Sequence, residues 1–169
     1  KAYEFSAWND IYDLVQSQSG KQVFSETHFL LKDREKLILS ERKLSNNSEV
    51  FIIESLDSKV NIPLKLVFSR FSGGRDVNSN CIFVDENKLK FPLTIRKWQE
   101  GDYFYPSGMN GKKKLSKYFK DEKYSLLDKE NQWLLCSEDQ IVWVIGKRAD
   151  DRFKSKETTQ NSIKIVLEE

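Results

Sequence analysis

The sequence predicts an α+β protein in which short β-strands dominate and helices are few. An amphipathic helical pattern near the N-terminus is followed by many short apolar stretches bounded by polar turns. Hydrophobic residues make up 38% of the 169 residues, which is enough to bury a core. We therefore expect a small β-rich domain with a mixed or antiparallel sheet and two or three short helices, preceded by an N-terminal amphipathic helix.

The N-terminal helix is predicted within residues 4–18. Its apolar side chains follow the i, i+3, i+4, i+7 spacing of one helix face, at Trp8, Ile11, Tyr12 and Val15. Ser6 is a suitable N-cap, and Gly20 is a suitable stop signal after the last turn.

Strands are predicted wherever apolar residues alternate with polar ones or form short runs between turns. In the first half of the chain they cover residues 22–25, 29–32, 36–40, 50–54, 62–68 and 81–85. In the second half they cover residues 93–97, 133–136, 141–145 and 163–167, the middle two as a β-hairpin. Residues 101–111 should form a long structured loop, and residues 114–120 a short helix.

Two parts are expected: a connecting region, residues 1–86, and a C-terminal domain, residues 87–169. Because the chain begins at Lys1 and has Met109 as its only methionine, we expect a piece of a longer protein. No signal peptide opens it, and its longest apolar run is five residues, against the roughly 20 that span a bilayer.

The cysteine and histidine content argues against disulfide and zinc frameworks. Cys81 and Cys136 lie among apolar neighbours without close spacing, which favours buried thiols in a reducing, cytoplasmic setting. His28 is the only histidine, so zinc sites built on several histidines or cysteines are excluded, and a structural role for His28 is expected.

Positive charge is concentrated in residues 96–120. This segment has seven basic residues against two acidic ones, whereas the rest of the chain has a surplus of three negative charges. The seven are Arg96, Lys97, Lys112, Lys113, Lys114, Lys117 and Lys120. Such concentration is expected of a surface that binds phosphates.

A glycine-bracketed turn precedes the lysine run. Gly108 and Gly111 flank two residues directly before Lys112, and a flexed turn of this kind exposes backbone N–H groups beside the lysines. That combination can hold an RNA phosphate without reading sequence. A solvated basic face that binds nothing explains the composition equally well.

A second basic group follows the predicted hairpin and consists of Lys147, Arg148, Arg152 and Lys154. Asp150 and Asp151 interrupt it and can pair with the arginines. Spacing alone therefore favours a structural role for this group, with local salt bridges.

Three further features of the sequence have both a functional and a structural interpretation. The segment Ser72-Gly73-Gly74-Arg75-Asp76 has the pattern of an ATP-pyrophosphatase loop, but no helix is predicted after it, so we expect a surface turn. Asp102, directly after Gly101, should cap the loop by accepting backbone N–H bonds. Trp133 and Trp143 should lie in the core, which leaves Trp98 as an interface candidate.

Two ordered blocks carry a resemblance to a known family: FPLTIRKWQEGDYFYPSGMNGKKKLSKYF, from residue 91, and WLLCSEDQIVWVIGKRADDRFK, from residue 133. Residues 91–154 resemble the C-terminal domain of bacterial tRNA(Ile)-lysidine synthetase. Residues 4–40 resemble, more loosely, the connecting region upstream in the same family. Departures from the family pattern occur at Trp98, Tyr103 and Lys117, and at Asp128 or Lys129.

The resemblance implies an enzyme that uses ATP, with Mg, to join lysine to the wobble cytidine of an isoleucine tRNA, so that the tRNA decodes AUA. It implies that the ATP site lies in an N-terminal domain missing here, that this fragment alone is inactive, and that its C-terminal domain binds the tRNA, including the acceptor end. The tRNA-binding residues expected are Arg96, Lys97, Lys112, Lys113, Lys114, Lys117, Arg148, Arg152 and Lys154. Gly101, Asp102, Gly108 and Gly111 are expected to shape the loop.

Two other hypotheses stay open. In one, the module is a scaffold that docks on the catalytic domain or forms a homodimer through Trp98, Tyr103 and Tyr105, and its lysines face water. In the other, it is a stand-alone ATP-using enzyme built on residues 72–76.

Overall fold

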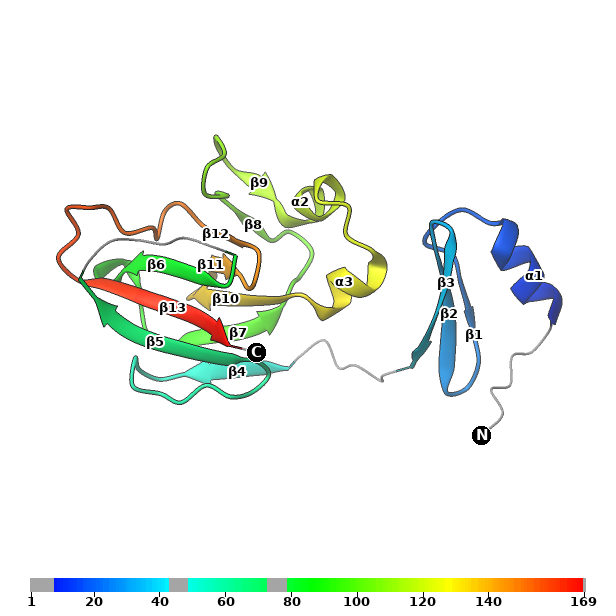
Figure 1. The fold of residues 1–169 in the computed structure, drawn as a ribbon, viewed down its shortest axis with the longest axis horizontal. Coiled ribbons are helices and arrows are strands. Elements are labelled where there is room, and N and C mark those ends of the chain that lie inside the picture. The colour runs from blue at the N-terminus through cyan, green and yellow to red at the C-terminus, as the bar shows by residue number, and fades with distance from the viewer. Residues whose placement is uncertain (1–7, 43–48, 73–78, 169) are drawn as a thin grey trace. The chain divides into compact units, whose positions relative to one another are not determined.

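The computed structural model describes residues 8–42, 49–72 and 79–168 (Figure 1). The chain divides into two compact units, Lys1–Asn46 and Asn47–Glu169, called unit 1 and unit 2 below.

Unit 1 combines one helix with a small antiparallel sheet. The helix α1 (Trp8–Gln16) precedes β1 (Gln22–Phe24), β2 (His28–Asp33) and β3 (Lys36–Glu41), which pair in the order β1-β2-β3. Leu14 is the buried residue of the helix, whereas Trp8 and Tyr12 of the expected apolar stripe are 84% and 69% exposed. The stripe is therefore not the buried face of α1. The predicted N-cap, Ser6, lies outside the described residues.

Unit 2 contains a five-stranded sheet in the order β12-β11-β10-β7-β4 and a three-stranded sheet in the order β5-β13-β6, with every pair antiparallel. A two-stranded ribbon, β8-β9, completes it. The strands are β4 (Val50–Ile53), β5 (Lys65–Phe71), β6 (Cys81–Asp85), β7 (Leu93–Lys97), β8 (Tyr103–Phe104), β9 (Lys113–Lys114), β10 (Trp133–Ser137), β11 (Gln140–Val144), β12 (Arg148–Ala149) and β13 (Ser162–Glu168). The helices are the 3₁₀ turn η1 (Glu86–Lys88), α2 (Leu115–Asp121) and α3 (Leu126–Asn131).

The five-stranded sheet of unit 2 is covered on both faces. Leu135 belongs to a core shared with Ile163 and Ile165 of the three-stranded sheet. Its neighbour Leu134 belongs to a second core, with Phe104 of β8 and Phe119 of α2. Because successive side chains of a strand point to opposite faces, β10 contributes to both cores and is buried almost throughout.

The pairing of the last strand, β13, shows which earlier segments belong to unit 2. β13 pairs along β5 on one side and along β6 on the other, so residues 65–71 and 81–85 belong to the same sheet as the C-terminal residues. The structural division therefore falls after Asn46, not at the boundary expected between residues 86 and 87. A partner strand nearly 100 residues away leaves no local trace in the sequence.

Most predicted elements are confirmed, including the hairpin formed by β10 and β11. The helix α3 was not predicted, although Ser125 and Asp128 form the reciprocal capping box that marks its start. Cys81 and Cys136 are both buried, as expected. Among the described residues, no helix has the length and apolar character needed to cross a membrane.

Candidate nucleic-acid interface

Four lysines from the basic segment line one open groove of about 410 Å³ on unit 2. They are Lys112, Lys113, Lys114 and Lys117. Met109, Asn110 and Gly111 of the preceding turn, together with Pro106 and Asp121, complete the lining. We call this the lysine groove. It gathers four of the predicted tRNA-binding residues at one place, with a single carboxylate among them.

The ribbon β8-β9 and helix α2 position these lysines. Tyr103 pairs with Lys114 and Phe104 with Lys113 in the ribbon. The chain then enters α2 at Leu115, whose N–H donates to the carbonyl of Asp102 at 2.8 Å. The buried residues of α2 follow an i, i+3, i+4 pattern, which turns Lys117 to solvent: they are Leu115, Tyr118 and Phe119.

The turn before the lysines has backbone conformations that favour glycine. Gly108 and Gly111 have φ angles of 79° and 82°, and Gly101 at the start of the loop has 94°. An added Cβ at these positions would meet no atom within 4 Å, so backbone conformation rather than space calls for glycine. Arg148 fixes the loop from β12 by donating to the carbonyl of Ser107 at 3.1 Å.

The groove lysines differ in their partners. Lys113 forms an ion pair of 2.8 Å with Asp121, and this hydrogen bond lowers the pKa of the Asp121 carboxyl. The ammonium of Lys112 lies 3.4 Å from the ring centroid of Tyr103. Lys114 and Lys117 are exposed and form no ion pair with any described residue. Phosphates are therefore most accessible to Lys112, Lys114 and Lys117.

Arg96 has a different environment from the one expected of a residue that binds phosphate. Its guanidinium donates to both carboxylate oxygens of Asp102 at 2.8 Å and to the carbonyl of Lys97 at 2.9 Å. Both side chains of the pair are largely buried, at 14% and 12% exposure. The hydrogen bond with Asp102 also raises the pKa of Arg96. Asp102 accepts the N–H of Gln99 at 2.8 Å, which confirms its predicted capping role.

Arg152 is held by the carboxylate of Asp150, as its spacing suggested. Asp150 is fully buried and accepts two hydrogen bonds of 2.8 Å from Arg152, one from the backbone and one from the guanidinium. It also accepts the N–H of Tyr105 at 2.9 Å. The pair therefore ties the loop after β12 to the residue that follows β8.

The other predicted tRNA-binding residues do not line the lysine groove. Lys97 places its ammonium 3.8 Å from the ring centroid of Trp133, and Lys154 is exposed beyond Phe153. Trp98 is half-buried and meets Phe119 edge to face, with 5.5 Å between ring centroids. Trp98 is thus packed against the second core.

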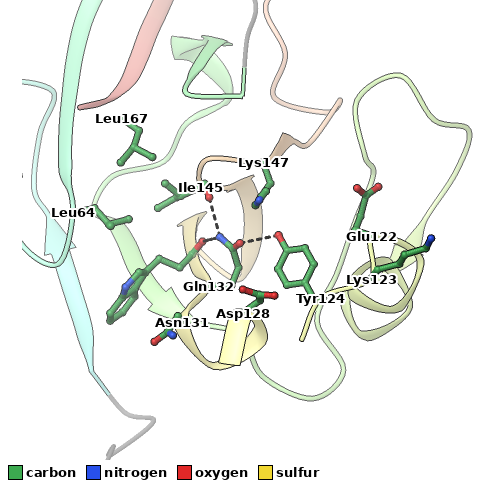
Figure 2. A pocket seen from close by; sticks show the side chains of 11 residues that line it. Leu64, Glu122, Lys123, Tyr124, Asp128, Asn131, Gln132, Ile145, Lys147 and Leu167 are labelled. Atoms are coloured by element: carbon green, nitrogen blue, oxygen red, sulfur yellow. Dashed lines mark hydrogen bonds between the residues drawn. The ribbon is translucent and has the colours of Figure 1, made fainter. Parts of the chain in front are cut away.

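A second hollow, of about 330 Å³, has no counterpart in the sequence analysis. Figure 2 shows its centre, where the hydroxyl of Tyr124 donates to Gln132 at 2.9 Å and Gln132 donates to the carbonyl of Ile145 at 2.9 Å. Gln132 also donates to the carbonyl of Trp133. The polar groups of Tyr124 and Gln132 thus form hydrogen bonds within the protein. Their presence in the hollow is explained by the fold alone.

Two other sequence features can be placed. His28 contacts the hydroxyl of Thr27 at 2.9 Å. Most of the loop-like segment 72–76 lies outside the described residues. Within the described ranges, no cluster of three or more histidine, cysteine or acidic side chains could hold a metal ion.

Comparison with family models identifies two parts of the chain. A model described as the TilS substrate binding domain matches residues 1–42, and one described as the TilS substrate C-terminal domain matches residues 93–166. Among solved structures, a crystal structure of a TilS C-terminal domain shares the fold, with a TM-score of 0.58 and 20% identity. It covers 71% of this chain, and the match spans 97% of that structure.

Curated relatives point the same way. The tRNA(Ile)-lysidine synthase of Parabacteroides distasonis is 41% identical over 156 residues, or 90% of this chain, and that of Bacteroides thetaiotaomicron is 37% identical over 165 residues, or 93%. The chain spans about 35% of the length of each relative. With both family models matched in order, the chain belongs to the tRNA(Ile)-lysidine synthase family and carries its C-terminal domain.

Proposed function

We propose that unit 2 binds the phosphate backbone of an isoleucine tRNA through the lysine groove. The observation that carries this proposal is the gathering of Lys112, Lys114 and Lys117 around one hollow, where they are exposed and form no ion pair with any described residue. Ammonium groups on flexible stems bind phosphates without reading bases, so the groove supplies affinity and position more than sequence choice.

The buried arginines have a different role in this proposal. Arg96 holds the turn at Gly101 and Asp102, and Arg152 holds the chain at Tyr105, so both position the loop that presents the lysines. Arg148 acts similarly through Ser107. The residues proposed to bind the tRNA phosphates are therefore Lys112, Lys114 and Lys117. We expect Lys97, Lys113 and Lys154 to contribute less to this binding.

The parent activity proposed is that of the relatives: ATP-dependent joining of lysine to the wobble cytidine of an isoleucine tRNA. ATP and Mg would bind in an N-terminal catalytic domain, and this chain would be inactive alone.

The experiment is a salt titration of tRNA binding. Replacing Lys112, Lys114 and Lys117 by glutamine should weaken binding and flatten the plot of log affinity against log salt, by roughly 0.7–0.9 for each phosphate that the variant no longer neutralises. A control with the same loss of charge replaces Lys59, Lys65 and Lys90, which lie outside the groove. Equal slopes for the groove variant and wild type, with both folded, would contradict the proposal.

An interdomain scaffold without RNA binding is the second candidate. It is favoured by the exposed Trp8 and Tyr12 on α1 in unit 1. Of the aromatics expected to form such an interface on unit 2, only Tyr103 is exposed, and neither the fold nor the relatives support the homodimer. Sedimentation of the chain with and without tRNA separates the candidates, because a scaffold would not sediment with the RNA.

A further inference from the structure

Tyr103 lies beside the lysine groove and is bracketed by two cations. Its side chain is on the short strand β8 and is 39% exposed. The ammonium of Lys112, which lines the groove, is 3.4 Å from its ring centroid, and the guanidinium carbon of Arg152 is 5.9 Å from it. The ring of Tyr103 and the lysine groove therefore share Lys112.

The surroundings of Tyr103 are anchored to one buried carboxylate, that of Asp150. Its ring meets Tyr105 edge to face, with 6.4 Å between centroids and an angle of 74°. Arg152 lies 4.6 Å from the ring centroid of Tyr105 and is clamped by Asp150, whose side chain is fully buried. The backbone of Tyr103 is paired with Lys114 in the ribbon. The ring is thus preorganised before any ligand arrives.

Such an arrangement suits one chemical class of ligand. Proteins that bind single-stranded nucleic acid combine a basic groove along the backbone with aromatic rings on which bases stack. Bases inside a duplex are already stacked on their neighbours, so only unpaired ones are available to a protein ring. Tyr103 supplies an exposed aromatic ring, and Lys112, Lys114 and Lys117 supply the basic groove beside it.

We propose that Tyr103, flanked by Lys112 and Arg152, is a stacking platform for an unpaired RNA base whose neighbouring phosphates lie in the lysine groove. The proposal deepens the proposed function and rests on it. Lys112 covers the ring in the unbound chain. When RNA binds, its ammonium turns to a phosphate and the base takes its place on the ring.

The test compares a short single-stranded RNA carrying 2-aminopurine with the same strand annealed to its complement. Tyr103→Leu keeps an apolar side chain but removes the aromatic face, and Tyr103→Phe keeps that face. The leucine variant should bind the single strand roughly 5- to 100-fold more weakly than wild type. The phenylalanine variant should match wild type, and the duplex should bind all three equally. Wild type should quench the 2-aminopurine fluorescence more strongly than the leucine variant.

The outcomes distinguish the stacking platform from tRNA binding by the lysine groove, on which it rests. Equal affinity of wild type and Tyr103→Leu for the single strand overturns the stacking platform, as does a wild type that binds tRNA but not the single strand. In both cases the lysine groove stands. If the wild type binds neither RNA nor whole tRNA, the proposed function fails, and the platform with it. Thermal melting of each variant confirms that it is folded.

Discussion

The guanidinium of Arg96 lies against the carboxylate of Asp102 with two hydrogen bonds of 2.8 Å, six residues apart in sequence and at opposite ends of one turn. Arg96 is on an inner strand of the five-stranded sheet, since β7 pairs with both β4 and β10. The backbone carbonyl of Asp102 in turn accepts a hydrogen bond from the start of α2. This pair therefore connects the sheet to the element that carries the lysines.

Breaking the pair should destabilise unit 2. Arg96→Met leaves Asp102 as a largely buried carboxylate without its cation, which we expect to lower the free energy of unfolding by about 3 kcal/mol. Lys90→Met is the control, because its ion pair with Glu138 is exposed and should contribute about 1 kcal/mol or less. Urea denaturation measures both. Equal effects of the two substitutions would show that the Arg96 pair stabilises the fold no more than a surface ion pair does.

Removing the carboxylate from the lysine groove should strengthen RNA binding. Hydrogen bonding to Lys113 lowers the pKa of Asp121 below its ordinary value of 3.8, so the carboxylate is charged at neutral pH and holds Lys113. Asp121→Asn releases Lys113, and the salt slope should steepen by roughly 0.7–0.9 if the lysine then binds one phosphate.

The matched control for that variant is Glu138→Gln, which removes one negative charge outside the groove. It should leave the slope unchanged. If the two variants increase tRNA affinity to the same extent and with the same slope, the effect comes from net charge, and Lys113 binds no phosphate.

The buried thiol of Cys136 should make stability depend on pH in the alkaline range. Burial raises its pKa from an ordinary 9.0 to about 11. The unfolded chain therefore loses this proton at lower pH than the folded chain. Below pH 9 the thiol has no effect on the pH dependence, and between about pH 9 and 11 the free energy of unfolding falls, by about 2 kcal/mol in total.

Comparison with Cys136→Ala isolates that contribution, because the other titrating groups are common to both proteins. The difference in unfolding free energy between wild type and variant should shrink as pH rises from 9 to 11. A difference that stays constant across this range would mean that the thiol is accessible to water.

The strands of unit 2 were largely predictable because burial imposes a local pattern. Residues 133–145 alternate or cluster apolar side chains around a polar turn, and they form the β10-β11 hairpin. Helix α2 was predictable for the same reason, since Leu115, Tyr118 and Phe119 repeat at helical spacing and are buried. On α1 this reasoning failed, because Leu14 and not the Trp8 stripe is buried.

The partner of each charge was less predictable. Asp150 and Arg152 are two residues apart, and their pairing could be anticipated. By contrast, Asp121 meets Lys113 only because α2 folds back beside the ribbon, and the hydrogen bond from Tyr105 to Asp150 spans 45 residues. From the sequence, Arg96, Lys113 and Lys117 were therefore equal candidates for binding phosphate, although of these three only Lys117 is exposed and outside an ion pair among the described residues.

The sequence by itself determined the strand-rich composition, the concentration of positive charge in residues 96–120 and the family resemblance, because each depends on the order of residues along the chain. Only the tertiary structure decided that β13 unites β5 with β6, that four lysines share one groove, and that Tyr103 stands beside it. Those relationships arise from packing between distant segments, where the free energy of burial and not local preference selects which side chains meet.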